Sequence, residues 1–174
     1  EPLEPRVLLS SSIGEVGQLA NLTDTVQSVL LQQSYLSPVV FALPPSFNGP
    51  DPAVVRIGNV QSDRFDIFLR EPGNKDGSHG AEAISYLVLE AGTWQISDGT
   101  LLEVGPLLNV NTWETINLEL SFGATPIVIS QVQDSGGAPY LKTRMSNITG
   151  GVDIPLIALH MSVDQHAVIY VDPG

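Results

Sequence analysis

The loop EPGNKDGSHGAE, residues 71–82, gathers side chains that could bind a ligand. Its carboxylates at alternating positions could supply oxygen atoms to a calcium ion. The spacing matches no calcium-binding loop, so a solvated hairpin loop is the favoured interpretation. The sequence offers His79 no partner that would make it a zinc ligand or a general base. Asp76, His79 and Glu82 are therefore candidate ligand-binding residues, with calcium as a candidate ion and no other cofactor or metal expected.

Catalytic motifs are missing from the chain. It has no cysteine and three histidines, and no serine lies in a G-x-S-x-G context. No acidic residue lies in a recognisable setting for glycoside hydrolysis. His160 and His166 could face each other across a hairpin and bind a metal, but half-buried strand residues are the favoured interpretation. We therefore expect no enzymatic activity and no catalytic residue.

An arginine occurs twice in the same setting. Arg56 lies in VVRIGNV (54–60) and Arg144 in LKTRMSNI (141–148), each within an apolar run and followed by Asn and a β-branched residue. Each arginine could contact a ligand. Each could equally be structural, with its guanidinium satisfied by a carboxylate or carbonyl oxygens at a sandwich edge or subunit interface. Both interpretations explain the recurrence.

Composition limits the classes of partner. The formal net charge is −12, from 19 acidic and 7 basic residues among 174. Such a surface repels nucleic acid and anionic lipid, whereas it suits solubility in a saline exterior. No apolar run reaches the ~18 residues of a membrane span. The chain begins with Glu1, which indicates processing or a portion of a longer chain.

The two arginines belong to a wider repeat. They are 144 − 56 = 88 positions apart, and the same spacing recurs around them. The other matches are Glu15-Val16-Gly17 with Glu103-Val104-Gly105, Pro38 with Pro126, and Asn59 with Asn147. Two copies of one small domain explain this pattern.

The repeat also decides between helix and strand for residues 16–30. Apolar residues at helical intervals would allow a helix there. The counterpart WETINLELSF (113–122) alternates between polar and apolar residues, which is typical of a strand with one buried face. Related copies should fold alike, so we predict strands in both.

We predict an all-β chain of two tandem antiparallel β-sandwich domains with about five or six strands each. The first domain covers 15–92 and the second 103–174, with a connector at 1–14 and a linker at 93–102. The expected strands are 25–33, 37–43, 53–60, 64–70 and 83–90, then 113–121, 125–132, 139–148, 152–159 and 165–171. Trp94 lies in the linker, where it either packs between the domains or stacks on a sugar.

The strand order resembles the H-type lectin domain. The resemblance rests on an aromatic followed by PVV or PIV, an Arg-containing strand ending in NV or NI, a strand such as FDIFL, and ISYLVLE. It covers each copy nearly end to end. It implies a six-stranded antiparallel sandwich that commonly trimerises and binds N-acetylgalactosamine between subunits. It also implies that Arg56 and Arg144 help to hold the sugar. The family's Trp-His pair has no clear counterpart, because Pro72-Gly73 stands in that region of the first copy.

LEPRVLLS (3–10) resembles the LEPR-x-LL motif near the N-termini of large secreted proteins of Gram-negative bacteria. The resemblance implies a secreted or cell-surface protein, and VLLS could add as a strand to a sheet edge.

Two functions follow as hypotheses. The first is a non-catalytic bacterial carbohydrate-binding or adhesion module that binds glycans through sandwich loops and gains avidity as a homo-oligomer. The second is a structural subunit of an extracellular assembly, a filament or matrix, that polymerises with neighbouring copies through sheet edges and the N-terminal strand. Neither involves nucleic acid or membrane insertion.

Overall fold

A computed structural model describes residues 13–43, 45–108, 113–116, 118–120, 122, 126–133, 142–145, 154–159 and 165–171. These residues form strands, turns and irregular segments, and no helix occurs among them. The prediction of an all-β chain is therefore confirmed for the described part. The connector at 1–14 lies outside it apart from Ile13 and Gly14.

The first six strands are β1 (Gly14–Leu22), β2 (Gln27–Leu30), β3 (Pro38–Ala42), β4 (Val54–Gln61), β5 (Arg64–Arg70) and β6 (Glu82–Glu90). The later strands are β7 (Gly92–Gln95), β8 (Leu101–Leu108), β9 (Trp113–Ile116), β10 (Ile127–Gln133), β11 (Lys142–Met145), β12 (Ile154–Leu159) and β13 (Gln165–Val171). Residues 16–30, which the repeat predicted as strands, contribute to β1 and β2 and contain no helix.

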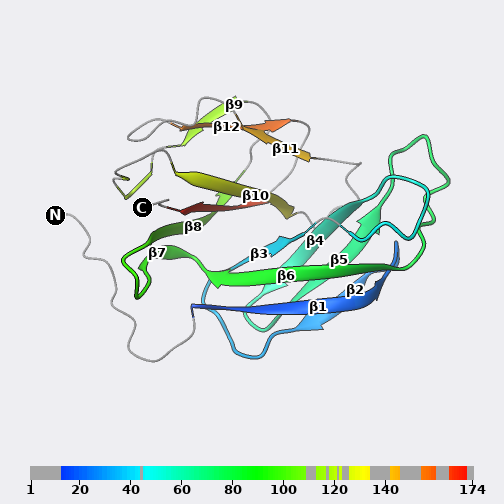
Figure 1. The fold of residues 1–174 in the computed structure, drawn as a ribbon, viewed down its shortest axis with the longest axis horizontal. Coiled ribbons are helices and arrows are strands. Elements are labelled where there is room, and N and C mark those ends of the chain that lie inside the picture. The colour runs from blue at the N-terminus through cyan, green and yellow to red at the C-terminus, as the bar shows by residue number, and fades with distance from the viewer. Residues whose placement is uncertain are drawn as a thin grey trace.

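Strand pairing follows the same order in both halves of the chain (Figure 1). The first half pairs its strands as β1-β6-β3 and β2-β5-β4, and the second as β8-β13-β10 and β9-β12-β11. Each strand of the first half thus has a counterpart seven places later in the strand order. One seven-stranded sheet, β2-β5-β4-β10-β13-β8-β7, runs through both halves. Its halves meet where β10 lies parallel to β4, at Gln133 and Ile57.

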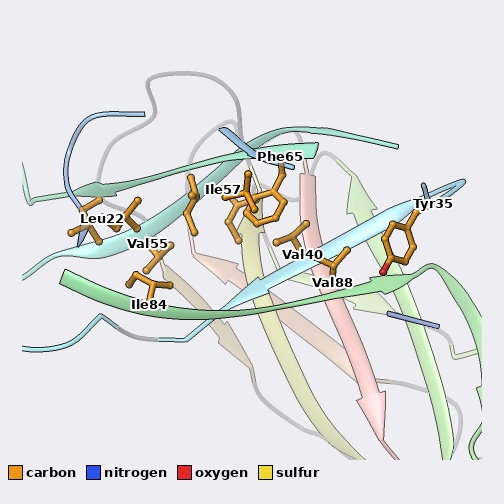
Figure 2. Close-up of a cluster of buried hydrophobic side chains, with 11 residues drawn as sticks. Leu22, Tyr35, Val40, Val55, Ile57, Phe65, Ile84 and Val88 are labelled. Atoms are coloured by element: carbon orange, nitrogen blue, oxygen red, sulfur yellow. The ribbon is translucent and has the colours of Figure 1, made fainter. Parts of the chain in front are cut away.

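The core of the first half lies between its two groups of three strands (Figure 2). In β5, Phe65, Ile67 and Leu69 are fully buried, as the alternation of RFDIFL predicts. They pack against residues of the facing sheet, such as Val40 of β3 and Val88 of β6. This is the arrangement of a β-sandwich.

A second buried cluster lies on the opposite face of the β1-β6-β3 sheet. It joins Val39 and Phe41 of β3 to Trp94 of β7 and Val104 of β8. The seven-stranded sheet therefore packs on both faces of β1-β6-β3, with β2-β5-β4 on one face and the β8-β7 end on the other. Residues 93–102, predicted as a linker, form most of a hairpin in which β7 pairs with β8.

Gly17 of β1 lies opposite Tyr86 of β6, and the ring of Tyr86 covers it. A methyl group at position 17 would lie 2.2 Å from ring atom Cζ of Tyr86. That ring packs edge-on against Phe65, with 5.3 Å between centroids, so it cannot retreat without disturbing the core.

We therefore expect Gly17→Ala to lower the free energy of unfolding by ~1–3 kcal/mol. Gly105 is the repeat counterpart of Gly17 and provides the matched control, because no described atom lies within 4 Å of a methyl group there. Urea denaturation of both variants measures the difference. Equal losses at the two positions would contradict the packing argument.

Candidate functional site

A cluster of buried ionisable side chains lies at one end of the first sandwich. Glu71 directly follows β5, Glu82 begins β6, and His79 lies in the loop between them. The His79 residue is 6% exposed, and both glutamates are also buried. Charged groups are seldom buried unless they are paired, so the contacts of this cluster define what it can do.

His79 lies between the two carboxylates. Its Nδ1 atom is 2.8 Å from Glu71 Oε1, and its Nε2 atom is 3.2 Å from Glu82 Oε1. A neutral imidazole donates from one nitrogen only, so both hydrogen bonds form together only in the imidazolium ion. Burial alone lowers the pKa of His79, but the hydrogen bonds and charges of Glu71 and Glu82 outweigh it and raise this pKa above its ordinary value.

Glu82 also accepts hydrogen bonds from the β3–β4 loop. The donors are Ser46 Oγ at 2.5 Å, the Asn48 amide at 3.0 Å and the Gly49 amide at 2.8 Å. Burial alone raises the pKa of Glu82, but these donors and His79 outweigh it and lower this pKa to about 2. Gly49 allows the close approach, since a methyl group there would lie 3.0 Å from the imidazole ring.

Two further hydrogen bonds connect the cluster to its surroundings. The His79 amide donates to Asp24 Oδ1 in the β1–β2 loop, at 3.2 Å. The Gly77 amide donates to Glu71 Oε2, also at 3.2 Å. The cluster thus connects the β1–β2, β3–β4 and β5–β6 loops, and the latter two lie together at the end of the sandwich (Figure 1).

These contacts correct the prediction of a hairpin loop at 71–82. Strand β5 pairs with β2 and β4, whereas β6 pairs with β1 and β3, so the loop crosses from one sheet to the other. Its central residues, 72–78, are partly or fully exposed, while both of its ends are buried. Because the loop crosses from one sheet to the other at the end of the sandwich, its first and last residues lie over the core.

The structure places the candidate ligand residues of this loop in different environments. His79 and Glu82 are buried together, whereas Asp76 is exposed and accepts a hydrogen bond from the Ser78 amide. The two glutamates contact opposite nitrogens of the imidazole ring. Among the described residues, no group of three or more His, Asp or Glu side chains is arranged to hold a metal ion.

Among the residues whose side chains the structure describes, Arg56 is the largest that is fully buried, at 1% exposure. It lies on β4 between the core residues Val55 and Ile57, and its side chain interacts with other groups in the structure. Burial favours the structural interpretation of Arg56. Arg144 lies on β11, opposite Ile157 of β12, just as Arg56 lies opposite Phe68 of β5. The side chain of Arg144 lies outside the described residues.

Trp94 is 8% exposed and packs in the second buried cluster. Its indole Nε1 donates a hydrogen bond to the Glu90 carbonyl oxygen at 3.0 Å. This burial leaves little of the ring accessible to a sugar in this arrangement. Its burial favours packing between β3, β6 and the β7–β8 hairpin.

An apolar groove, which the sequence did not indicate, lies between the outer face of β1-β6-β3 and β10. Its volume is about 490 Å³. Val16, Phe41, Leu87 and Ile129 contribute to its walls. No ionisable side chain other than Tyr86 lines it, so it offers space for an apolar group and little acid–base chemistry.

Two glutamines add polar contacts between the halves. The buried Gln133 side chain accepts a hydrogen bond from the Val40 amide at 3.2 Å. Gln131 Nε2 donates to the Val55 carbonyl oxygen at 3.4 Å. Strand β10 is thus bonded through side chains to both β3 and β4.

The repeat spacing corresponds to a repeated hydrogen bond. Glu15 of β1 accepts the Gln32 amide at 2.9 Å, and Glu103 of β8 accepts the Leu120 amide at 2.9 Å. The glutamates are 103 − 15 = 88 positions apart, and the amides 120 − 32 = 88. In each half this carboxylate accepts a hydrogen bond from a backbone amide that follows the second strand. Burial raises the pKa of Glu103, which the amides of Leu120 and Glu119 partly offset.

Comparison with known proteins gives one informative similarity. No family model matches the sequence, and no solved structure matches the fold. The chain is 33% identical over 142 residues to halomucin from Haloquadratum walsbyi. The aligned region takes in 75% of this chain and 2% of halomucin, so the chain spans a small fraction of that relative's length. The described residues include no helix long and apolar enough to cross a membrane.

Proposed function

We propose that this chain is a non-catalytic structural module of an extracellular or cell-surface assembly. It consists of two tandem H-type lectin-like β-sandwiches. The tandem arrangement is supported by the pairing order shared by the two halves and by the matching hydrogen bonds of Glu15 and Glu103. The similarity to halomucin supports the surface location.

The observation that carries this proposal is the interlocking of the two halves. One continuous sheet runs through both, and its β8-β7 end covers the outer face of β1-β6-β3. The buried side chain of Trp94 packs on that face, and the buried side chain of Gln133 bonds to the Val40 amide of β3. An interface with an apolar core and satisfied polar groups gives a rigid unit, which suits a load-bearing segment of a long surface protein.

Light scattering on the full chain and on a chain lacking residues 1–12 tests the proposal. A structural module that uses its N-terminal segment as connector should form species that grow with concentration. Deletion of residues 1–12 should abolish that growth. A small closed oligomer of fixed mass in both chains would contradict the structural role.

Glycan binding is the second candidate function. Arg56 and Arg144 lie on corresponding strands of the two halves, β4 and β11, which is where the resemblance implies a sugar-binding arginine. A glycan array probed with the same full chain distinguishes the two functions. Selective retention on N-acetylgalactosamine that is lost in Arg144→Ala, together with a closed oligomer, would favour the lectin role.

A further inference from the structure

We propose that Glu71, His79 and Glu82 form a pH-sensitive latch that holds the loops at one end of the first sandwich closed while His79 is protonated. The latch joins groups from three loops. The imidazole contacts both carboxylates, Glu82 holds the amides of Asn48 and Gly49, and Asp24 holds the amide of His79.

The geometry makes the latch depend on a single proton. With both ring nitrogens protonated, His79 donates one hydrogen bond to each carboxylate. When it loses a proton, one nitrogen lone pair faces a buried carboxylate oxygen. The two buried negative charges of Glu71 and Glu82 then lack the cation between them. Opening the loops lets water hydrogen-bond to the free nitrogen and solvate the two carboxylates. Deprotonation of His79 therefore favours the open state.

The charged groups near His79 are few. Glu71 and Glu82 are the ones that face the ring, and Asp24 contacts its backbone amide. The exposed part of the β5–β6 loop carries Asp76 and Lys75, and Lys75 forms an ion pair with Asp51 of the β3–β4 loop. The two carboxylates therefore govern the titration.

The direction of the pH effect follows from linkage. The pKa of His79 is raised in the closed state, so the latch is fully effective below the ordinary histidine pKa. The stabilising effect of the latch is lost as the pH rises from about 6.5 through the raised pKa of His79. Within that pH window the equilibrium constant for opening of the loops increases about tenfold per pH unit. Below and above the window it does not change with pH.

Amide hydrogen exchange on the full chain, followed by NMR across this pH range, tests the latch. After correction for the intrinsic pH dependence of exchange, the opening equilibrium at Asn48 and Gly49 should rise about tenfold per unit in the window. The amide of Tyr35, which bonds to the Ser62 carbonyl oxygen in the β4–β5 turn, should show no such rise. The histidine ring signals of the same sample give the pKa of His79 directly.

Two variants make the test specific. His79→Gln should abolish the pH dependence at Asn48 and Gly49, and it identifies the His79 signal among those of the three histidines. Asp76→Asn removes an exposed charge from the same loop and should leave the dependence unchanged. If His79→Gln fails to fold, the ring titration of the native chain still decides. A His79 pKa at or below 6.5, or opening without pH dependence, would overturn the proposal.

Discussion

We expect the replacement of Glu82 with alanine to lower the free energy of unfolding by ~3–5 kcal/mol. The variant leaves the His79 cation with one carboxylate and deprives the amides of Asn48 and Gly49 of their acceptor. Each of these groups is then buried without its partner, which costs more than the lost attraction alone. Chemical denaturation at neutral pH measures the loss.

Acid stability gives an independent measure of the same carboxylate. The pKa of Glu82 is lowered to about 2, so its contribution is complete above the ordinary glutamate pKa. The contribution disappears as the pH falls toward 2. Glu82→Gln keeps the shape of the side chain without its charge. The free energy of unfolding of this variant should therefore fall less on acidification than that of the native chain, because the contribution of the Glu82 charge is already absent.

Asp76→Ala is the matched control, because it removes an exposed carboxylate from the same loop. Its expected effect lies within ~0.5 kcal/mol. If the free energies of unfolding of Glu82→Ala and Asp76→Ala were equal, the buried cluster would have no energetic role.

The strand pattern was accessible from the sequence because one face of each sheet is buried. Strand β5 was predicted as 64–70 and is observed at Arg64–Arg70, where every second residue enters the core. Residues 14–22 were harder to assign. Only the end of β1, at Leu22, is fully buried, while Val16 is exposed, so the strand carries a weak alternation.

The buried cluster was inaccessible for a different reason. Glu71 and Glu82 lie eight and three residues from His79, and neither spacing signals a contact. They meet because the loop crosses between two sheets, which a pattern of local periodicity does not reveal. The same limit applies to Arg56. The sequence located it correctly within a strand, but its burial depends on groups distant in the chain.

Trp94 was identified from the sequence as a residue that either joins the halves or binds sugar, and its burial leads to the second large prediction. Trp94→Ala should lower the free energy of unfolding by ~3–5 kcal/mol, because it removes a large side chain from a packed cluster. It should also weaken the coupling between halves, since Trp94 connects β3 and β6 with β8.

Calorimetry distinguishes these two effects of Trp94→Ala. The native chain should unfold in one cooperative transition, whereas the variant should show two, one for each sandwich. Trp94→Phe is the matched control: it keeps most of the apolar contact and loses the hydrogen bond to Glu90, so a smaller loss within a single transition is expected. A single transition in Trp94→Ala, with a loss below ~1 kcal/mol, would mean that the halves are not held together through this cluster. Coupling of the halves would then rest on their other contacts, the hydrogen bond between the Val40 amide and Gln133 and the β4–β10 pairing at Ile57.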